Sequence, residues 1–261
     1  MLEVFKINYT AGGRQIIDDL SASFHPGKLH LIVGPNGAGK STLVKLLAGY
    51  LPPSSGSIEY GGTPVAEIPD RELAGFRSVL SQSVETAFPL TVREIVMMGR
   101  YPHFGGRPGP ADEAVVDELL KLFEIAEFGR RNFQTLSGGE RQRVNFARVL
   151  AQLRLPSNSR ARCRYLFLDE PLTFLDIRHQ LDFMKKVRAF TASSDVVTIG
   201  VVHDLNLAAG FADQMVLMNN GRCVENGAPK DVLTADRIRE VFGVETKFIP
   251  LDDARQYLIF G

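Results

Sequence analysis

The residues best suited to chemistry in this chain form a glycine-rich segment that could bind phosphate. Gly34 to Ser41 fits the pattern G-x-x-x-x-G-K-[ST] and follows an apolar run, Leu29–Val33, that we expect to be a buried strand. Glycines let backbone N–H groups converge on phosphate oxygens, and a helix from about Lys40 to Gly49 would point the positive end of its dipole there. The segment therefore predicts a cradle for a triphosphate. The cradle residues are Gly34, Pro35, Asn36, Gly37, Ala38, Gly39, Lys40, Ser41 and Thr42.

An acidic pair further along the chain could complete this chemistry. The apolar run 165–168 predicts a buried strand that ends in Asp169 and Glu170. Adjacent residues on a strand face opposite sides, so the two carboxylates can hold different roles. We expect Lys40 to bind the β- and γ-phosphates and Ser41 and Asp169 to ligate Mg²⁺. Glu170 is then expected to orient or deprotonate the attacking water.

A second glycine pair, Gly138 and Gly139, precedes a predicted helix. Ser137 is a good N-cap residue, and the glycines permit a close approach of the backbone to an anion. Taken alone, the pattern indicates a capped helix more often than a ligand site. A single triphosphate needs only one cradle, so a second anion site points to a second copy of the chain.

The order of these elements resembles that of the ATP-binding cassette (ABC) ATPases. The resemblance rests on the sequence LSGGERQR from Leu136 to Arg143, which stands between the phosphate cradle and the acidic pair. In that family the signature serine and glycines complete the ATP site of the opposite subunit, which implies a homodimer holding two ATP molecules head to tail. The implied fold class is α/β: a P-loop (RecA-like) core with an N-terminal antiparallel β part and an inserted helical subdomain.

The resemblance also assigns roles to residues outside these motifs. Tyr9 is similar to the aromatic residue that stacks on adenine, and Gln82 to the Q-loop glutamine that contacts Mg²⁺ or water and reports to a membrane partner. His203 resembles the switch histidine that contacts the γ-phosphate, and Asp176 the D-loop aspartate. Residues 172–176 read Leu-Thr-Phe-Leu-Asp where the family usually has Thr-Ser-Ala-Leu-Asp, so bulky side chains are expected at the dimer seam.

Composition narrows the class of protein. The 261 residues are 44% hydrophobic, and 30 basic and 30 acidic residues give no net charge, which disfavours a nucleic-acid partner. No apolar run approaches the roughly 18–20 residues that cross a bilayer, and the first residues do not resemble a secretory signal. Two cysteines, Cys163 and Cys223, are too few and too far apart for a disulfide framework or a metal site. We expect a soluble protein of a reducing compartment.

The organisation expected along the chain is a single nucleotide-binding domain spanning residues 1–261. Its P-loop core would take about residues 1–83 and 160–230, with a helical subdomain at about 84–155 and a C-terminal extension at about 231–261. Residues 54–62 read as a hairpin region. Thr91, with Glu94 three residues on, predicts a capped helix, and Asp112 predicts the cap of a longer one. Strands are expected at 196–202 and 215–218.

A free-standing cassette of this family implies membrane partners. The resemblance predicts two transmembrane permease subunits, a periplasmic or surface substrate-binding protein reached through them, and a peripheral location at the cytoplasmic face of the cell membrane. Residues 98–103 (Met-Gly-Arg-Tyr-Pro-His) resemble ATPases of haem, iron-siderophore and vitamin B12 importers, and the long link 153–164 with residues 241–244 favours haemin. The alternative cargo is a ferric siderophore or vitamin B12. The rival classes of protein are a nucleotide-gated clamp that does not transport and an exporter ATPase.

Overall fold

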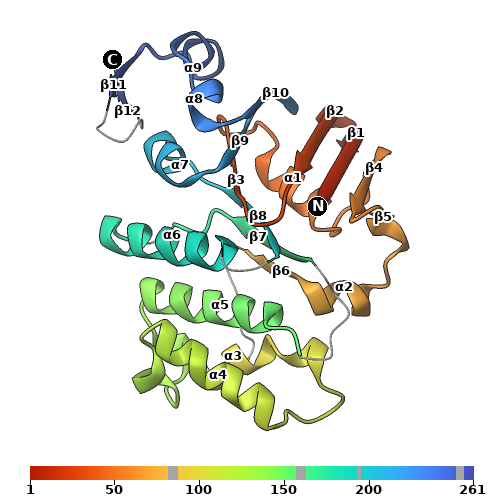
Figure 1. The fold of residues 1–261 in the computed structure, drawn as a ribbon, viewed down its shortest axis with the longest axis vertical. Helices are drawn as coiled ribbons and strands as arrows, with labels where there is room; N and C mark the ends of the chain where they lie inside the picture. Colours follow the sequence, from red (N-terminus) through yellow and green to blue (C-terminus); the bar gives the residue numbers. More distant parts are fainter. Residues whose placement is uncertain (82–87, 157–162, 174, 193–194, 251–255) are drawn as a thin grey trace.

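The computed structural model describes residues 1–81, 88–156, 163–173, 175–192, 195–250 and 256–261. Within these residues a six-stranded sheet, ordered β10-β9-β3-β8-β7-β6, forms the centre of the molecule (Figure 1). Only β10 runs antiparallel to its neighbour, and the other pairs are parallel. The strands are β3 (Leu29–Val33), β6 (Arg77–Leu80), β7 (Arg164–Asp169), β8 (Val196–Val201), β9 (Gln214–Asn219) and β10 (Arg222–Gly227).

The strands predicted from apolar runs are confirmed in this sheet. All five residues of β3 and all six of β8 are buried. Burial on both faces explains why these strands are mainly apolar, with His30 and Thr198 as their buried polar residues, because an alternating pattern marks a sheet with one solvated face. The carboxyl ends of β3, β7 and β8 therefore meet at one edge, where the cradle loop and the acidic pair begin.

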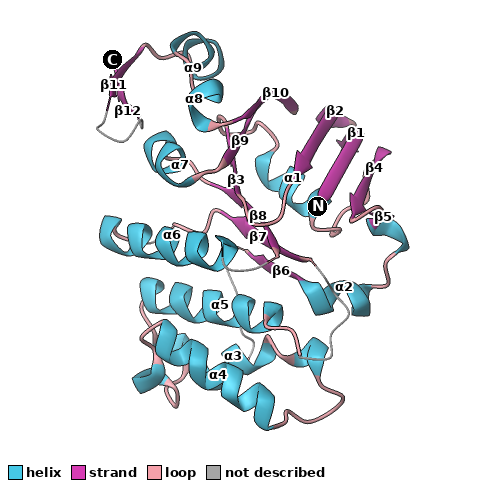
Figure 2. Ribbon diagram, viewed as in Figure 1, coloured by secondary structure: helices cyan, strands magenta, loops and turns pink. Residues whose placement is uncertain are grey.

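A smaller antiparallel sheet, ordered β2-β1-β4-β5, is built from the N-terminal residues (Figure 2). The segment 54–62 indeed forms paired strands, although β4 has its longer pairing with β1. The turn joining β1 to β2 is Gly12-Gly13, where both φ angles are positive, as a two-residue hairpin requires. The strands are β1 (Leu2–Ala11), β2 (Arg14–Phe24), β4 (Ser55–Tyr60) and β5 (Thr63–Pro64).

One end of the molecule is a helical block formed by α3, α4 and α5, and α6 lies between this block and the sheet (Figure 1). Ring contacts tie the layers together: Phe123 lies 5.2 Å from Phe146, and Phe146 lies 4.4 Å from Phe183 on α6, measured between ring centroids. The helices are α1 (Lys40–Leu47), α2 (Asp70–Phe76), α3 (Val92–Met98), α4 (Pro110–Leu122), α5 (Gly138–Leu153), α6 (Ile177–Ala192), α7 (Leu205–Phe211), α8 (Pro229–Val232) and α9 (Ala235–Phe242).

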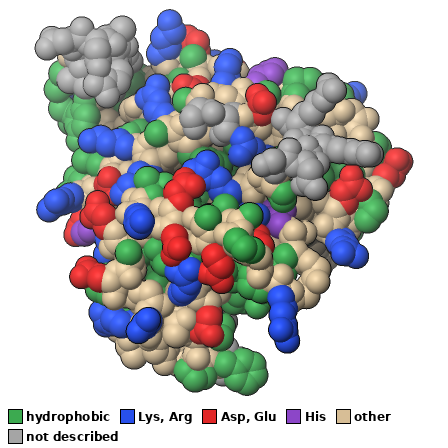
Figure 3. Space-filling view, turned by 60° about the horizontal axis from the view of Figure 1, so that its bottom comes forward, with side chains coloured by type: hydrophobic (Ala, Val, Ile, Leu, Met, Phe, Trp, Pro, Cys, Tyr) green, Lys and Arg blue, Asp and Glu red, His purple; other side chains and the backbone are tan. Residues whose placement is uncertain are grey.

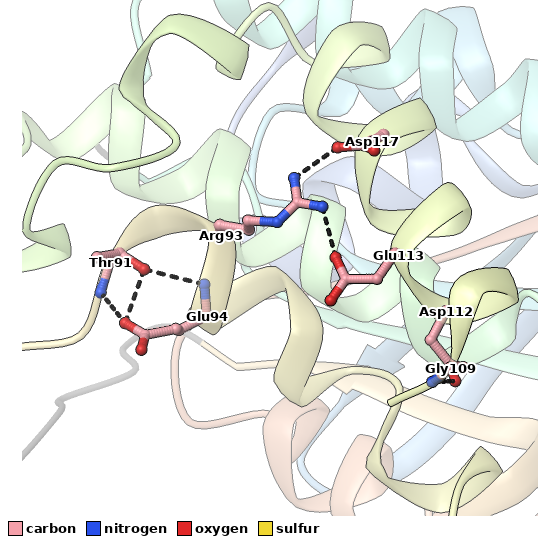
Figure 4. Close-up of polar contacts among 7 residues, drawn as sticks. All are labelled: Thr91, Arg93, Glu94, Gly109, Asp112, Glu113 and Asp117. Atoms are coloured by element: carbon pink, nitrogen blue, oxygen red, sulfur yellow. Dashed lines mark hydrogen bonds and ion pairs between the residues drawn. The ribbon is translucent and has the colours of Figure 1, made fainter. Parts of the chain in front are cut away.

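The two predicted helix caps in this block have different outcomes. Thr91 caps α3 in a capping box with Glu94, as predicted (Figure 4). The prediction for Asp112 is wrong, because α4 begins at Pro110 and its N-cap is Gly109. Proline suits the first turn, where an N–H would have no partner in the helix. Asp112 instead accepts a hydrogen bond from the Gly109 N–H (2.9 Å) and forms a buried ion pair with Arg100 (3.0 Å).

The C-terminal residues carried no readable chemistry in the sequence, and here they form α8, α9 and a hairpin of β11 (Thr246–Pro250) and β12 (Gln256–Phe260). None of the helices among the described residues has the length and apolar character that crossing a membrane requires.

The surface drawn in Figure 3 carries both acidic and basic side chains, which are interspersed rather than gathered by charge.

Candidate nucleotide-binding site

The cradle loop between β3 and α1 contains glycines at positions where a side chain does not fit. A Cβ on Gly34, whose φ is +151°, would lie 2.2 Å from the carbonyl oxygen of Met218. A Cβ on Gly39, with φ +96°, would lie 2.9 Å from the carbonyl oxygen of Ile16. These glycines thus let the loop pack against β2 and β9 as well as expose its N–H groups, a second reason that the sequence pattern alone does not give.

The first turn of α1 is left open. Gly39 is the N-cap residue and makes no side-chain cap, so the N–H groups that start the helix keep their hydrogen-bonding capacity for an anion. Lys40 is 5% exposed, and its Nζ donates to the carbonyl oxygens of Gly34 and Pro35, both at 2.8 Å. Burial lowers the pKa of Lys40, while the nearby carboxylates Glu170 and Asp169 oppose this shift.

A cavity of about 480 Å³ opens over this loop and includes most of the predicted cradle. Its lining also contains residues that sequence reasoning missed. Arg14, Gln15 and Ile16 come from β2, and Asn220 and Gly221 from the turn between β9 and β10. The residues lining it are Arg14, Gln15, Ile16, Asn36, Gly37, Gly39, Lys40, Ser41, Thr42, Glu170, Asn220 and Gly221.

The missed residues have a partial sequence signal. Asn220-Gly221 is a two-residue hairpin dipeptide, and both φ angles are positive, +46° and +81°. The dipeptide predicts the turn but not its neighbours. The Gly221 N–H donates to the carbonyl of Ala38 at 3.1 Å, and the Asp18 N–H donates to the carbonyl of Gly221 at 3.0 Å. These contacts join parts of the chain far apart in sequence, so local patterns could not reveal them.

The predicted metal ligands Ser41 and Asp169 are close together. The Ser41 hydroxyl is a hydrogen-bond partner of the Asp169 carboxylate. Burial raises the pKa of Asp169, while this hydrogen bond acts to lower it. The Oδ1 atom of Asp169 is buried and has no hydrogen-bond partner among the described residues. A hydroxyl and a carboxylate oxygen are the hard ligands that Mg²⁺ takes, so this pair fits the ion. The third predicted ligand, Gln82, lies outside the described residues.

Glu170 and His203 are brought together at the carboxyl ends of β7 and β8. The Oε1 atom of Glu170 lies 3.0 Å from Nε2 of His203. Glu170 has φ +51°, a left-handed conformation that costs a non-glycine residue about 1 kcal/mol or more. The two carboxylates are therefore separated by this backbone turn, because β7 already ends at Asp169 and strand alternation does not reach Glu170.

Comparison with known proteins decides the family. The ABC transporter family profile matches residues 17–173, more than half of the chain. The hemin import ATP-binding protein HmuV of Rhizobium meliloti (strain 1021) is 44% identical over 243 residues, which cover 93% of this chain and 91% of that protein. The protein of the same name from Escherichia coli O157:H7 is 40% identical over 245 residues, covering 94% and 93%. The chain belongs to the ABC transporter family.

Solved structures agree on the fold of this ABC ATPase. An inward-facing ABC transporter described as of the metal-chelate type superposes with a TM-score of 0.82 at 24% identity, over 100% of this chain and 96% of the other. The cassette MJ1267 gives a TM-score of 0.79 at 22% identity, over 93% and 98%. The predicted α/β P-loop fold is confirmed, and so is the prediction of an ATP-binding, ATP-hydrolysing transport ATPase.

The signature of this ABC ATPase lies at the exposed start of α5. Ser137 is its N-cap residue, as predicted, and forms a capping box with Glu140. Ser137, Gly138 and Gly139 are not among the residues that line the cradle cavity. Within α5, the buried Gln142 donates from Nε2 to the carbonyl of Pro171 at 2.6 Å, which links the signature helix to the segment after Glu170.

The other residues to which the family resemblance assigned a role differ in their burial and contacts. Tyr9, on β1, is half-buried and packs against the apolar core beneath the N-terminal sheet. Asp176 is exposed and accepts a hydrogen bond from the His179 N–H at 2.9 Å. Leu172, expected at a dimer seam, is half-buried and packs against the core, and Phe174 lies outside the described residues. The adenine role of Tyr9 and the seam role of Asp176 stay predictions.

Proposed function

We propose that this chain is the ATP-hydrolysing subunit that powers a haemin importer. The observation that carries the proposal is the contact between Glu170 and His203 beside the cradle. It brings a carboxylate suited to activating water next to a group suited to contacting the transferred phosphate. The cargo is taken from the hemin import relatives, whose similarity extends over more than nine tenths of the chain.

The residues of the site divide the work of hydrolysis. The open N–H groups of α1 and the Lys40 ammonium hold the polyphosphate. Glu170 orients and deprotonates the attacking water, and His203 contacts the γ-phosphate. Ser41 and Asp169 would hold Mg²⁺, which neutralises charge on the phosphates when bound. Tyr9 stacks on adenine, and Gln82 contacts Mg²⁺ or water.

The second part of the proposal is a homodimer in which Ser137, Gly138, Gly139 and Asp176 complete the partner's ATP site. Ser137 and Asp176 are exposed, and Ile177 beside Asp176 exposes 75% of its surface, as expected of a face that meets another protein. The cassette MJ0796, solved as a dimer, has the same fold, with a TM-score of 0.76 at 22% identity over 88% of this chain and 99% of the other.

The dimer is proposed to work with membrane subunits. ATP binding closes the dimer and hydrolysis reopens it, which moves two transmembrane permease subunits between access states, because ATP favours the closed form. A periplasmic or surface binding protein delivers cargo to the permease. The ATPase itself is proposed to sit peripherally at the cytoplasmic face of the membrane, without a nucleic-acid partner.

The substitution Glu170→Gln tests the catalytic assignment. We expect ATP turnover to fall by about a hundredfold or more, because general-base catalysis is worth at least that much, while ATP binding is retained. With MgATP, the variant should elute as a dimer in size-exclusion chromatography with light scattering. Glu240→Gln, on the exposed side of α9, is the matched control and should behave as the wild type. Unchanged turnover in Glu170→Gln would remove Glu170 from its role.

The cargo requires a separate experiment. The chain is reconstituted in proteoliposomes with its cognate permease, and ATP-driven uptake of haemin, a ferric siderophore and vitamin B12 is compared. The proposal expects haemin uptake that Glu170→Gln abolishes. Uptake of only one of the other chelates would reassign the cargo and leave the ATPase mechanism standing.

A further inference from the structure

A second cavity lies far from the chemistry of the cradle, between α7, α8 and the C-terminal hairpin. Figure 1 shows these elements next to one another at the end of the molecule opposite α3 and α4. The cavity has a volume of about 250 Å³. None of its lining residues belongs to the nucleotide site. Those that decide its chemistry are Arg188, Gly210, Lys230, Leu233, Phe248 and Leu258.

The inner part of the cavity is apolar and held in a fixed shape. Leu233 and Leu258 are almost fully buried, and Phe248 packs against the same core. The amide of Asn206 on α7 binds the backbone of Leu258 twice: it donates to the carbonyl at 3.0 Å and accepts from the N–H at 2.7 Å. These bonds fix β12 against α7, so one wall of the cavity does not depend on apolar contact alone.

Gly210 leaves open space in the wall of the cavity. It is the last residue but one of α7 (Leu205–Phe211), where alanine would favour the helix more than glycine does. Its φ angle is not in the left-handed range, and a Cβ added there would meet no atom within 4 Å. Neither backbone conformation nor close packing therefore demands glycine at this position. Because Gly210 has no side chain, the space beside it in the cavity wall is open.

The rim of the cavity is basic. Arg188 on α6 and Lys230 on α8 are both exposed, and the lining residues of the cavity include no carboxylate. Asp213 lies beside Arg188, with 3.7 Å between Oδ1 and the guanidinium, so its charge offsets part of that of Arg188, and its Oδ2 accepts the Leu29 N–H at 2.8 Å. Lys230 forms no ion pair with any residue that the structure describes. The rim therefore favours an anion.

We propose that this cavity binds a small amphiphilic monocarboxylate. The carboxylate lies between Arg188 and Lys230, and the apolar chain lies on Leu233, Phe248 and Leu258 in the space that Gly210 leaves open. A dry cavity of about 150 Å³ holds benzene, so by proportion this one takes roughly ten non-hydrogen atoms. A medium-chain fatty acid has this size. The proposal does not depend on which cargo the transporter carries.

Octanoate and its neutral counterpart 1-octanol provide the first test, with binding to the full chain measured by calorimetry. We expect octanoate to bind with one-to-one stoichiometry and more tightly than 1-octanol. Arg188→Gln combined with Lys230→Gln should weaken octanoate by about tenfold or more, because charge-assisted hydrogen bonds are lost. Lys185→Gln, on the same helix but outside the lining, is the control and should change nothing. Equal affinities for octanoate and 1-octanol would overturn the proposal.

Substitutions at Gly210 test the location of the site. Gly210→Leu should fill the cavity and abolish octanoate binding, while ATP binding shows that the variant is folded. Gly210→Ala is a milder second variant: it should raise the melting temperature, because alanine favours the helix, and weaken octanoate binding. Octanoate affinity unchanged in Gly210→Ala, or retained in a folded Gly210→Leu, would place any octanoate site elsewhere and refute the assignment.

Discussion

The two glycine-containing helix starts of this molecule, at α1 and α5, differ in how their N–H groups are satisfied. Gly39 begins α1 without any side-chain cap. Ser137 begins α5 in a closed capping box: its N–H donates to Glu140 Oε2 at 2.7 Å, and its Oγ accepts from the Glu140 N–H at 3.4 Å. The start of α1 is thus open to an anion, whereas at the start of α5 the capping box engages the N–H groups of Ser137 and Glu140 but not those of Gly138 and Gly139.

The two helix starts also differ in their exposure to solvent. Lys40 is buried among loop carbonyl groups, while Ser137 and Gly138 are exposed to solvent. A single chain therefore contains a preorganised phosphate site at α1 and an exposed, self-capped surface at α5. The difference teaches that glycine and a helix start are not sufficient for a complete phosphate site within one chain. What the start of α5 lacks is a loop and a lysine that surround the anion, as they do at α1.

The largest contrast is expected from adding one methyl group to the cradle loop before α1 and one to the start of α5. Gly34→Ala forces a Cβ against the Met218 carbonyl, so we expect ATP binding to weaken by at least about a hundredfold and the free energy of unfolding to fall by about 2 kcal/mol or more. In Gly139→Ala, the nearest atom would be Leu175 Cδ2 at an ordinary 3.7 Å. Single-chain ATP binding, measured by calorimetry, should be normal in that variant. Equal losses of ATP affinity in Gly34→Ala and Gly139→Ala would contradict the difference between the starts of α1 and α5.

A smaller effect on the same binding step is expected from Lys40→Ala. The ammonium group leaves its two loop carbonyls to bind phosphate, so its loss should weaken ATP binding by about tenfold or more. Fluorescent-nucleotide titration of the isolated chain measures this. Unchanged affinity would contradict the cradle assignment.

Ser137→Ala should have its effect on stability. Removal of an N-cap side chain costs about 1 kcal/mol in the free energy of unfolding, measured by urea denaturation. ATP affinity of the single chain should stay as in the wild type, because Ser137 does not line that chain's cradle. A drop in single-chain affinity would mean that the two helix starts are coupled within one protomer.

The smallest effect is a pH dependence at the start of α5. Hydrogen bonds from the Ser137 N–H and hydroxyl lower the pKa of Glu140 from its ordinary 4.5. The unfolded chain binds the proton more readily, so this contribution to stability is full above pH 4.5 and is lost as pH falls through the lowered value. Glu140→Gln keeps an acceptor for the cap. The difference in free energy of unfolding between wild type and Glu140→Gln should therefore become smaller as the pH is lowered. A difference that does not change with pH would mean that the charge of Glu140 contributes nothing to the cap.

Much of this fold could be predicted from local patterns. The strand 29–33 has the predicted bounds, because a strand buried on both faces is mainly apolar, here with His30 as its one polar residue. The caps at Thr91 and Ser137 were predictable, since the residues that satisfy each helix start are at most three positions apart. The prediction for Asp112 failed for a related reason: its side chain does take part in the cap, but it accepts from the N–H of the N-cap residue Gly109 and lies inside a helix that begins at Pro110.

The parts of the site that depend on long-range packing were not predictable. Arg14 and Asn220 border the cradle only because two hairpins meet the loop from opposite ends of the chain. The left-handed backbone of Glu170 has no signal in a strand pattern, although it determines where the carboxylate lies. The C-terminal cavity is assembled from α6, α7, α8 and a hairpin, so no single segment of the sequence marks it.

The hydrogen bond from Gln142 to the Pro171 carbonyl has a mechanical consequence. It connects α5, the helix proposed to face a partner chain, with the residue that directly follows Glu170, the proposed catalytic carboxylate. Rotation of α5 would either carry the residues that follow β7 along or break this buried hydrogen bond, which costs free energy because the buried amide loses its partner. A partner contact at α5, as proposed, would thus be one hydrogen bond away from the segment that carries Glu170 in the same chain.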